Sequence, residues 1–236
     1  MKFIFSFLFA AAVLLILTGS AHAQFISWSG PFSITGDSDI KTNGSYVDAF
    51  QAASAGAFGK DGIVETANTV AFNPNSGTNT DGTITLSGNM GPGSDGYAPG
   101  GSSSAYQAIL ADCQYTGGVG TVTLGSVTNP LVVGDEYQVQ VWNSTPYDAT
   151  SYTGSTPTDT ITAPINTYEI GTFTATGTTA SFTVGAPPAG TLHTSGAYVV
   201  DAISLRDIPE PSTYAMLIGG LALLGFCVHR RAASIS

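Results

Sequence analysis

The sequence predicts an all-β protein: an antiparallel β-sandwich of jelly-roll kind with one short helix. Three observations predict this fold. Apolar and polar residues alternate over short runs, as they do in strands with one buried face. Clusters of Gly, Pro, Asn, Asp and Ser separate these runs and mark turns. Helical spacing of apolar residues occurs in only one segment, whereas a parallel α/β fold would need several helices.

The clearest expected strand is 136–142, with Tyr137, Val139 and Val141 on one face and Trp142 on the other. Further along, 168–175 and 179–184 predict a hairpin across the turn 176–178. The last expected strand is 197–205, which places Val199, Ile203 and Leu205 on one face and Tyr198 and Val200 on the other. Earlier strands are expected at 25–28, 45–50, 83–86 and 119–124, with a mostly extended stretch at 62–72.

The expected helix is 102–114, because Ser102 or Ser103 can cap it and its apolar residues recur at helical spacing. Segments rich in Asn, Ser, Thr, Gly and Pro predict long loops at 73–82 and 88–101, and a long loop or an edge at 143–167.

The first 23 residues have the pattern of a secretory signal peptide. Met1 and Lys2 precede an apolar run, 3–17, which predicts a signal helix. Ala21 and Ala23 flank His22 as a small-x-small exit, so we expect cleavage before Gln24. The alternative is an uncleaved N-terminal anchor.

The C-terminal segment predicts a transmembrane helix. Residues 214–228 carry no charge and no proline, and as a helix they would span roughly 22 Å, a minimal membrane crossing. Arg230 and Arg231 follow, and basic residues prefer the cytoplasmic side, so 232–236 is the expected cytoplasmic end and the bulk of the chain lies outside. The alternative is a buried core helix.

Pro209-Glu210-Pro211 stands before this apolar run, and two prolines keep such a segment extended. Residues 208–231 contain, in order, Pro-Glu-Pro, a short polar stretch, an apolar helix and an Arg pair. This order resembles the PEP-CTERM sorting signal of Gram-negative bacteria. The resemblance implies that an exosortase, an integral-membrane transpeptidase, recognises Pro209, Glu210 and Pro211 and removes the tail. It also implies transient anchoring in the inner membrane, followed by delivery to the cell surface or extracellular matrix.

Between the two ends lies an expected single ectodomain, 24–207. Of the chain's 16 acidic and 6 basic residues, this part keeps 15 acidic residues and 3 basic ones, Lys41, Lys60 and Arg206. Nucleic-acid binding needs clustered Lys and Arg, so the composition excludes nucleic acid as a partner. Cys113 is expected to be a buried small hydrophobe, with a reactive thiol as the alternative.

The run of strand patterns from Ala105 onward resembles the galactose-binding-like sandwiches found before such tails in surface proteins. The resemblance is carried by 105–110, 121–124, 131–142, 169–175 and 201–206. It implies a β-sandwich ectodomain, and no ligand residue is carried over because the loop after Trp142 lacks a charged pair present in many relatives.

Signatures of catalysis are weak. The ectodomain has a single histidine, His193, and no Gly-x-Ser-x-Gly elbow, which argues against a hydrolase triad. One His and one Cys are too few for the usual zinc sites, so no metal site is expected. Calcium is an alternative at Asp37, Asp39 and the 73–82 loop, weighed against Asx turns that use the same side chains.

The sequence therefore predicts a non-enzymatic surface or matrix protein with a structural or adhesive role in an exopolysaccharide layer. A carbohydrate-binding module is the first alternative, with Trp142 as the candidate that stacks on a sugar ring; burial in the core is the competing interpretation. A polysaccharide hydrolase, which needs two facing carboxylates, is the second alternative.

Overall fold

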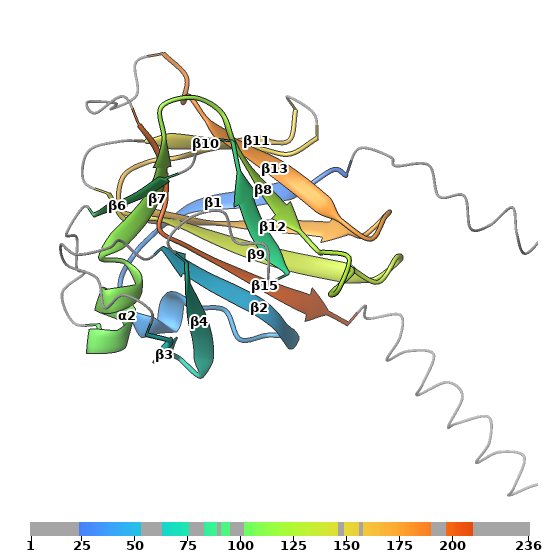
Figure 1. Ribbon diagram of the computed structural model, residues 1–236, viewed down its shortest axis with the longest axis horizontal. Coiled ribbons are helices and arrows are strands. Elements are labelled where there is room, and N and C mark those ends of the chain that lie inside the picture. The colour runs from blue at the N-terminus through green and yellow to red at the C-terminus, as the bar shows by residue number, and fades with distance from the viewer. Residues whose placement is uncertain are drawn as a thin grey trace, which may run out of the picture.

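Two β-sheets that share one core dominate the computed structural model of the protein (Figure 1). The structure describes residues 24–52, 63–75, 83–88, 91–94, 102–145, 149–155, 158–189 and 197–209. The expected signal helix and transmembrane helix lie outside these residues. Within them, no helix combines the length and the apolar character that a membrane crossing requires.

The first sheet has seven strands in the order β1-β12-β9-β15-β2-β4-β3, and the second has five in the order β11-β10-β13-β8-β5. A third sheet has the order β14-β7-β6. All pairs are antiparallel except β2 with β4, which is parallel. The bounds are β1 (Ser27–Ser33), β2 (Ser45–Ala52), β3 (Glu65–Ala67), β4 (Val70–Asn75), β5 (Ile84–Ser87), β6 (Gly91–Ser94), β7 (Asp112–Thr116), β8 (Gly120–Leu124), β9 (Glu136–Asn143), β10 (Thr150–Thr153), β11 (Thr160–Ala163), β12 (Thr167–Thr174), β13 (Ala180–Gly185), β14 (Tyr198–Val200) and β15 (Ala202–Ile208).

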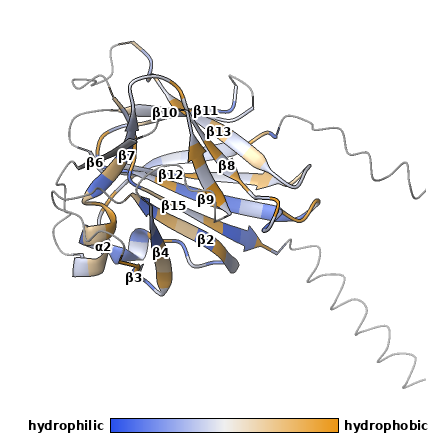
Figure 2. Cartoon of the chain, viewed as in Figure 1, coloured by the Kyte–Doolittle hydropathy of each residue, from blue (hydrophilic) through white to orange (hydrophobic). Residues whose placement is uncertain are grey.

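Buried apolar side chains form two clusters, one on each face of the first sheet. The larger cluster takes residues from both main sheets, among them Val139 and Ile203 from the first and Val122 and Phe182 from the second. The smaller cluster lies on the other face of the first sheet, where β3 and the helix α2 (Ser104–Ile109) cover it. Hydrophobic and hydrophilic residues alternate along many strands, which is the pattern such packing requires (Figure 2).

The predicted mostly-β character is confirmed, and the jelly-roll order remains a prediction. The strand predicted at 136–142 is confirmed as β9, and Tyr137, Val139 and Val141 do face the core between the sheets. The extended stretch at 62–72 is a hairpin, β3 to β4, whose turn residues Asn68 and Thr69 both have positive φ.

The predicted helix 102–114 is wrong beyond its first half. Ser103 caps α2 by accepting a hydrogen bond from the Tyr106 amide, as expected, but the helix ends at Ile109. Residues 112–114 belong to β7, which pairs with β6 and β14. Pairing on both sides satisfies the backbone of β7 and overrides the local helical spacing.

The predicted hairpin between 168–175 and 179–184 is also wrong. β12 belongs to the first sheet and β13 to the second, so this connection crosses the sandwich instead of joining neighbours. The last expected strand, 197–205, is broken at Asp201: β14 pairs with β7, whereas β15 pairs with β2 and β9. Val199 therefore does not share the core cluster that holds Ile203 and Leu205.

One strand, β6, lies inside 88–101, which was predicted to be a loop. β10 and β11 pair with each other inside 143–167, predicted as a long loop or an edge, and β11 is an edge strand of the second sheet. Thr, Ser and Gly give these strands little apolar alternation, so the pattern search missed them. In β6, a Cβ at Gly93 would come within 2.7 Å of the Tyr115 ring, which explains a glycine there.

Candidate functional site

The two described chain ends leave the sandwich from the same end, which we call the exit end (Figure 1). Ile208, the last residue of β15, pairs with Glu136 at the start of β9. Glu136 pairs in turn with Thr174 at the end of β12, and Gln24 binds that same end. The exit end also includes the connections 125–135 and 175–179. Both described chain ends, Gln24 and Pro209, therefore lie at this end of the domain.

Gln24, the predicted first residue after signal cleavage, is fixed to the end of β12. Its side-chain amide donates to the Thr174 carbonyl at 2.6 Å, and its Oε1 accepts from the amide and hydroxyl of Thr176 at 2.9 and 3.1 Å. Ala21 and Ala23, the other residues of the expected cleavage site, lie outside the described residues. The described fold therefore begins with an anchored residue at the position where the sequence predicts the mature chain to begin.

The candidate sorting residues begin directly after the last strand. β15 is paired along its length with β9, and its final residue is Ile208. Pro209 follows immediately and is half-buried. Glu210, Pro211, Arg230 and Arg231 lie outside the described residues. No spacer thus separates the sheet from the Pro-Glu-Pro segment.

Arg206 ties β15 to the start of β2. Its guanidinium donates to the carbonyls of Asn43, Thr42 and Gly44 at 2.7, 3.0 and 2.9 Å. The residue is only 7% exposed, and burial lowers the pKa of Arg206 from its ordinary value. Gly44 has a φ of 76°, and a Cβ there would clash with the Asp207 carbonyl, so this close approach needs glycine. The loop and the strand that leads to the tail are therefore held as one unit.

An open cavity of about 430 Å³ lies between Gln24 and Phe25 on one side and the ends of β9 and β12 on the other. Phe25 is 53% exposed, so its ring is accessible. The other lining residues are mostly polar: Glu136, Thr172, Thr174 and Thr176, with Phe173 beneath them. The cavity thus combines an accessible aromatic ring with hydroxyl groups and a carboxylate.

Residues 125–135, which we call the valine loop, expose three valines at the exit end. Val127, Val132 and Val133 are 100%, 56% and 60% exposed. The loop is nevertheless held firmly: the Val132 amide donates to the Tyr137 hydroxyl at 2.9 Å, and the Gly134 amide to the Ala175 carbonyl at 2.8 Å.

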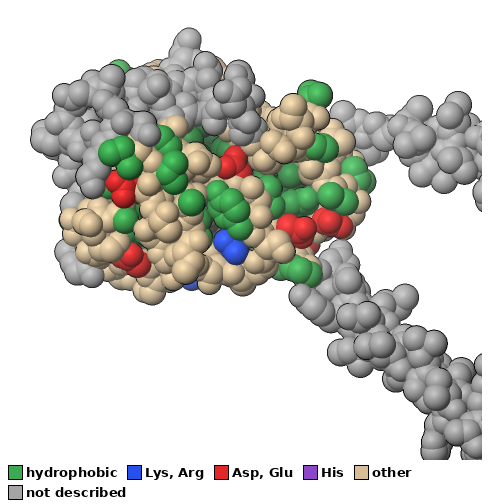
Figure 3. Space-filling model, turned by 60° about the horizontal axis from the view of Figure 1, so that its bottom comes forward, with side chains coloured by type: hydrophobic (Ala, Val, Ile, Leu, Met, Phe, Trp, Pro, Cys, Tyr) green, Lys and Arg blue, Asp and Glu red, His purple; other side chains and the backbone are tan. Residues whose placement is uncertain are grey.

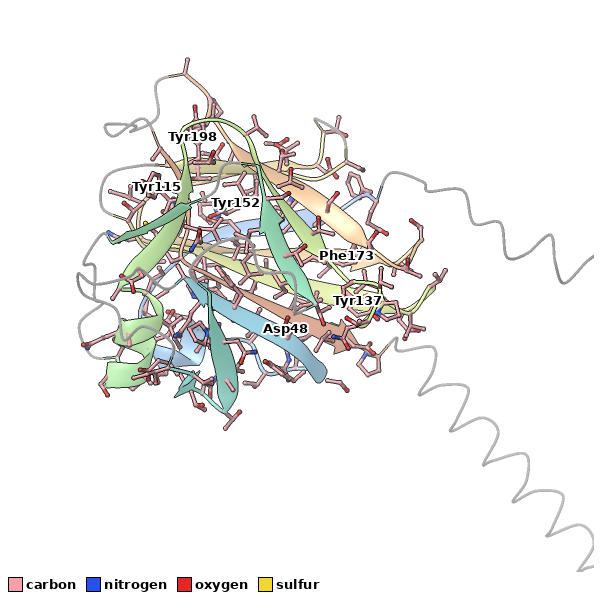
Figure 4. All side chains as sticks on the ribbon, in the orientation of Figure 1. Asp48, Tyr115, Tyr137, Tyr152, Phe173 and Tyr198 are labelled. Carbon is pink, nitrogen blue, oxygen red and sulfur yellow. The ribbon has the colours of Figure 1, made fainter. Side chains whose placement is uncertain are left out.

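Tyr137, which holds the valine loop, is itself stacked on Phe173, with ring centroids 5.6 Å apart (Figure 4). The exit end also carries carboxylates. Burial, and then the neighbouring Asp135 carboxylate, raise the pKa of Asp207. Figure 3 shows hydrophobic and acidic side chains together at this end of the domain.

Trp142, the predicted sugar-stacking residue, is fully buried, and the expectation of an accessible ring is wrong. It does lie on the face opposite Val141, as its position in β9 predicts, but that face is covered by α2 and β3. Its Nε1 donates to the Tyr106 hydroxyl at 3.0 Å, and Phe72 packs edge-on against its ring. A residue so enclosed supports the core and offers no surface to a sugar.

A buried polar group lies between the sheets, at the far end of β12 from the tail. Glu169 and Asp201 are both 0% exposed. Burial, and then these two carboxylates, raise the pKa of the buried Tyr152. Burial raises the pKa of Glu169 to about 8, so this carboxyl is mostly neutral at pH 7. Neither carboxylate is open to a substrate from solvent.

The stretches considered for calcium use their carboxylates within the chain. Asp39 accepts from the amides of Thr35 and Gly36, and Asp37 accepts from the Ser103 amide. Asp39 thus bonds backbone amides three and four residues before it, and Asp37 bonds the amide of the residue that caps α2, so these contacts are not the Asx turns of the alternative interpretation. Within the part of the chain that the structure describes, no group of three His, Cys, Asp or Glu could hold a metal ion. Residues 76–82 of the 73–82 loop and His193 lie outside that part, and Cys113 is buried as expected.

Sequence reasoning missed the residues that build the exit end. Nothing in the sequence alone places Gln24, Arg206 and the valine loop together, because they meet only through the strand order. The one available signal was Val132-Val133 before Gly134-Asp135, an apolar pair next to a turn.

Residues 207–231 match the family described as the PEP-CTERM protein-sorting motif. No curated protein matches the chain. A solved structure described as the basis for the promiscuous specificity of carbohydrate-binding modules from the β-sandwich superfamily is 13% identical. That alignment covers 81% of this chain and 98% of the other, with a TM-score of 0.25, and at this score the likeness carries no argument.

Proposed function

We propose that the protein is an exported cell-surface or matrix protein whose β-rich domain is delivered by its C-terminal tail. The observation that carries this proposal is the sorting motif at 207–231, which begins within β15. An exosortase-type membrane transpeptidase is the partner, and the Pro-Glu-Pro segment is what it recognises. The tail holds the protein in the inner membrane until it is removed.

The geometry supports this assignment in one respect. Transfer of a tail requires that its recognition segment be accessible while the cargo is folded. Pro209 follows the last paired residue, Ile208, so the motif begins where the pairing of β15 ends. The prolines also cannot supply amide donors to extend the β15 ladder, so the strand stops where recognition must begin.

The test is the replacement of Pro209, Glu210 and Pro211 by alanine in the full chain. We expect the variant to stay in the inner membrane with its tail attached, because the recognition segment is gone while the apolar run remains. Gel mobility of the membrane fraction and mass spectrometry of the C-terminus measure this. Replacement of Pro187 and Pro188 by alanine is the matched control and should leave delivery unchanged.

Delivery of the triple-alanine variant to the surface at the wild-type level, with the same processed C-terminus, would refute the exosortase assignment. Mass spectrometry of the wild-type protein also identifies any group joined to the new C-terminus.

After delivery, we propose a structural or adhesive role in an exopolysaccharide layer. The sequence of the domain is negatively charged and has no cluster of basic residues, so nucleic acid is not among the proposed partners. The domain carries its own core between two sheets, so it can serve as folded material outside the cell.

Carbohydrate binding is a second candidate, and the cavity at Phe25 favours it. Protein sites for small polar ligands are concave and combine apolar or aromatic walls with a few polar groups. An exposed Phe25 ring beside Thr172, Thr174 and Glu136 has this composition. The site differs from the one predicted at Trp142, which is enclosed by the core.

Binding to cellulose, xylan and the purified exopolysaccharide of the producing cells tests this candidate. Phe25→Ala should weaken retention by roughly tenfold or more, because the accessible ring is lost. Phe32→Ala is the matched control, since Phe32 is 39% exposed but lies outside the cavity. Equal retention of the two variants and the wild type would remove the candidate.

A further inference from the structure

The valine loop must lie close to the membrane while the tail is in place. Five residues, 209–213, connect Ile208 to Tyr214, the first residue of the apolar run, and these six steps along the chain span at most about 20 Å when fully extended. A domain of this length has a radius of gyration of roughly 16 Å. The tether is therefore too short for the domain to place a distant face against the enzyme that processes the tail.

The exit end is also where exposed apolar side chains gather on an ordered loop. Of the large hydrophobic side chains that are exposed in the described parts of the chain, Val127, Val132 and Val133 fall within seven residues. Hydrogen bonds from Val132 to Tyr137 and from Gly134 to Ala175 keep the loop in place. Leu131, between these valines, instead packs into the core. Exposed apolar groups that are held rigidly at one end of a domain mark an interaction surface.

Two occupants come within reach of this surface: the bilayer and a protein embedded in it. The carboxylates of Asp135, Glu136 and Asp207 lie at the same end. The pKa of Asp207 is raised by burial and by Asp135, so an anionic headgroup nearby would add further repulsion. Valine also lacks the amphipathic ring that suits a membrane interface. A protein face with apolar and basic groups fits this end better than lipid does.

We propose that the valine loop is the surface on which the membrane enzyme that removes the tail docks against its folded substrate. The proposal rests on the exosortase assignment above. The enzyme would contact the Pro-Glu-Pro segment and, at the same time, Val127, Val132 and Val133. Docking would add to recognition of the short motif and would favour folded cargo, because the loop is assembled only when β9, β12 and β13 are in place.

The test measures the rate of tail removal from the full chain in cells that contain the enzyme. Val132→Ser combined with Val133→Ser should slow removal by roughly tenfold, because two apolar contacts are lost. Val127→Ser alone should slow it less. Val119→Ser is the matched control: this valine is 65% exposed but lies at the opposite end, beside Gly185, and its replacement should leave the rate unchanged.

Chemical unfolding of each variant checks that the domain remains folded. Wild-type processing of the double serine variant, or equal slowing by Val119→Ser, overturns docking. Altered partition of the double variant into phosphatidylethanolamine–phosphatidylglycerol vesicles, with wild-type processing, would assign the surface to lipid and overturn it as well. If the triple-alanine variant is not retained in the inner membrane with its tail attached, the proposed function itself is contradicted. The two failures are therefore distinguishable.

Discussion

The charge of Glu169 is coupled to folding. Its side chain is fully buried between the sheets, with the Thr167 hydroxyl 2.8 Å from Oε1. Within the described residues, Oε2 has no hydrogen-bond partner. Burial raises its pKa from 4.5 to about 8, so the folded protein holds a proton that the unfolded chain releases at neutral pH. Folding stability is therefore greatest below about pH 4.5 for this group and is lost as the pH rises towards 8.

Glu169→Gln should stabilise the protein at neutral and alkaline pH. The neutral amide resembles the protonated acid, so the cost of holding a proton disappears, and the expected gain at pH 7 is on the order of 3 kcal/mol. The free energy of unfolding, from urea titrations between about pH 5 and pH 8, measures this. The wild-type value should fall with pH more steeply than that of the variant, and equal slopes would contradict a buried neutral carboxyl.

β15 is the element that connects the core to the tail. Besides its backbone pairing with β2 and β9, it is held by the side-chain hydrogen bonds of Arg206 to residues 42–44. Arg206→Met should destabilise the protein by about 1.5–3 kcal/mol, because the carbonyls of residues 42–44 lose their charged donor. Amide hydrogen exchange at Asp207 and Ile208 should also become faster.

Lys41→Met is the control for this change. The Lys41 ammonium lies 5.7 Å from the centroid of the Tyr168 ring, a contact worth about 0.5–1 kcal/mol. A comparable loss of stability in both variants would show that removal of a positive charge, and not the detached loop, is responsible.

How far the sequence predicts an element depends on where its stabilising contacts lie. β9 was predicted well because its alternation is strong and both of its faces are used. β6 was missed, and β11 was expected only as part of a long loop or an edge, because a neighbouring strand supplies their hydrogen bonds while their own side chains show little pattern. The crossing between β12 and β13 was missed because a short turn looks the same whether the next strand pairs or changes sheets.

In the candidate site, too, features encoded by neighbouring residues could be predicted, and features set by distant parts of the chain could not. The order of residues in the tail is local, so the sorting motif could be recognised from the sequence. The side that buries Trp142 is set by α2 and β3, which come from distant parts of the chain, and alternation in β9 alone could not reveal that cover. The clamp of Arg206 on residues 42–44 spans more than 160 positions and gives no sequence signal.

At the scale of the whole molecule, both described ends emerge on one side, so the domain has a membrane side and a far side while the tail remains. In the triple-alanine variant, Val132→Cys should react more slowly with a bulky, membrane-impermeant maleimide than Val119→Cys, because the tether keeps the exit end within about 20 Å of the bilayer. Cys113 is buried and should contribute little background. Equal rates before and after detergent extraction would contradict this orientation.

The position of β15 between β9 and β2 has a mechanical consequence. A pull on the C-terminal end of β15, resisted at the far side of the domain, acts along the strand, and the ladders to both neighbours must slide together before the strand can come free. Separating strands in shear breaks many bonds at once, whereas an edge strand pulled sideways peels bond by bond. A domain attached through β15, a strand in the interior of its sheet, can thus bear tension at its point of attachment, as material outside a cell must when fluid flows past it.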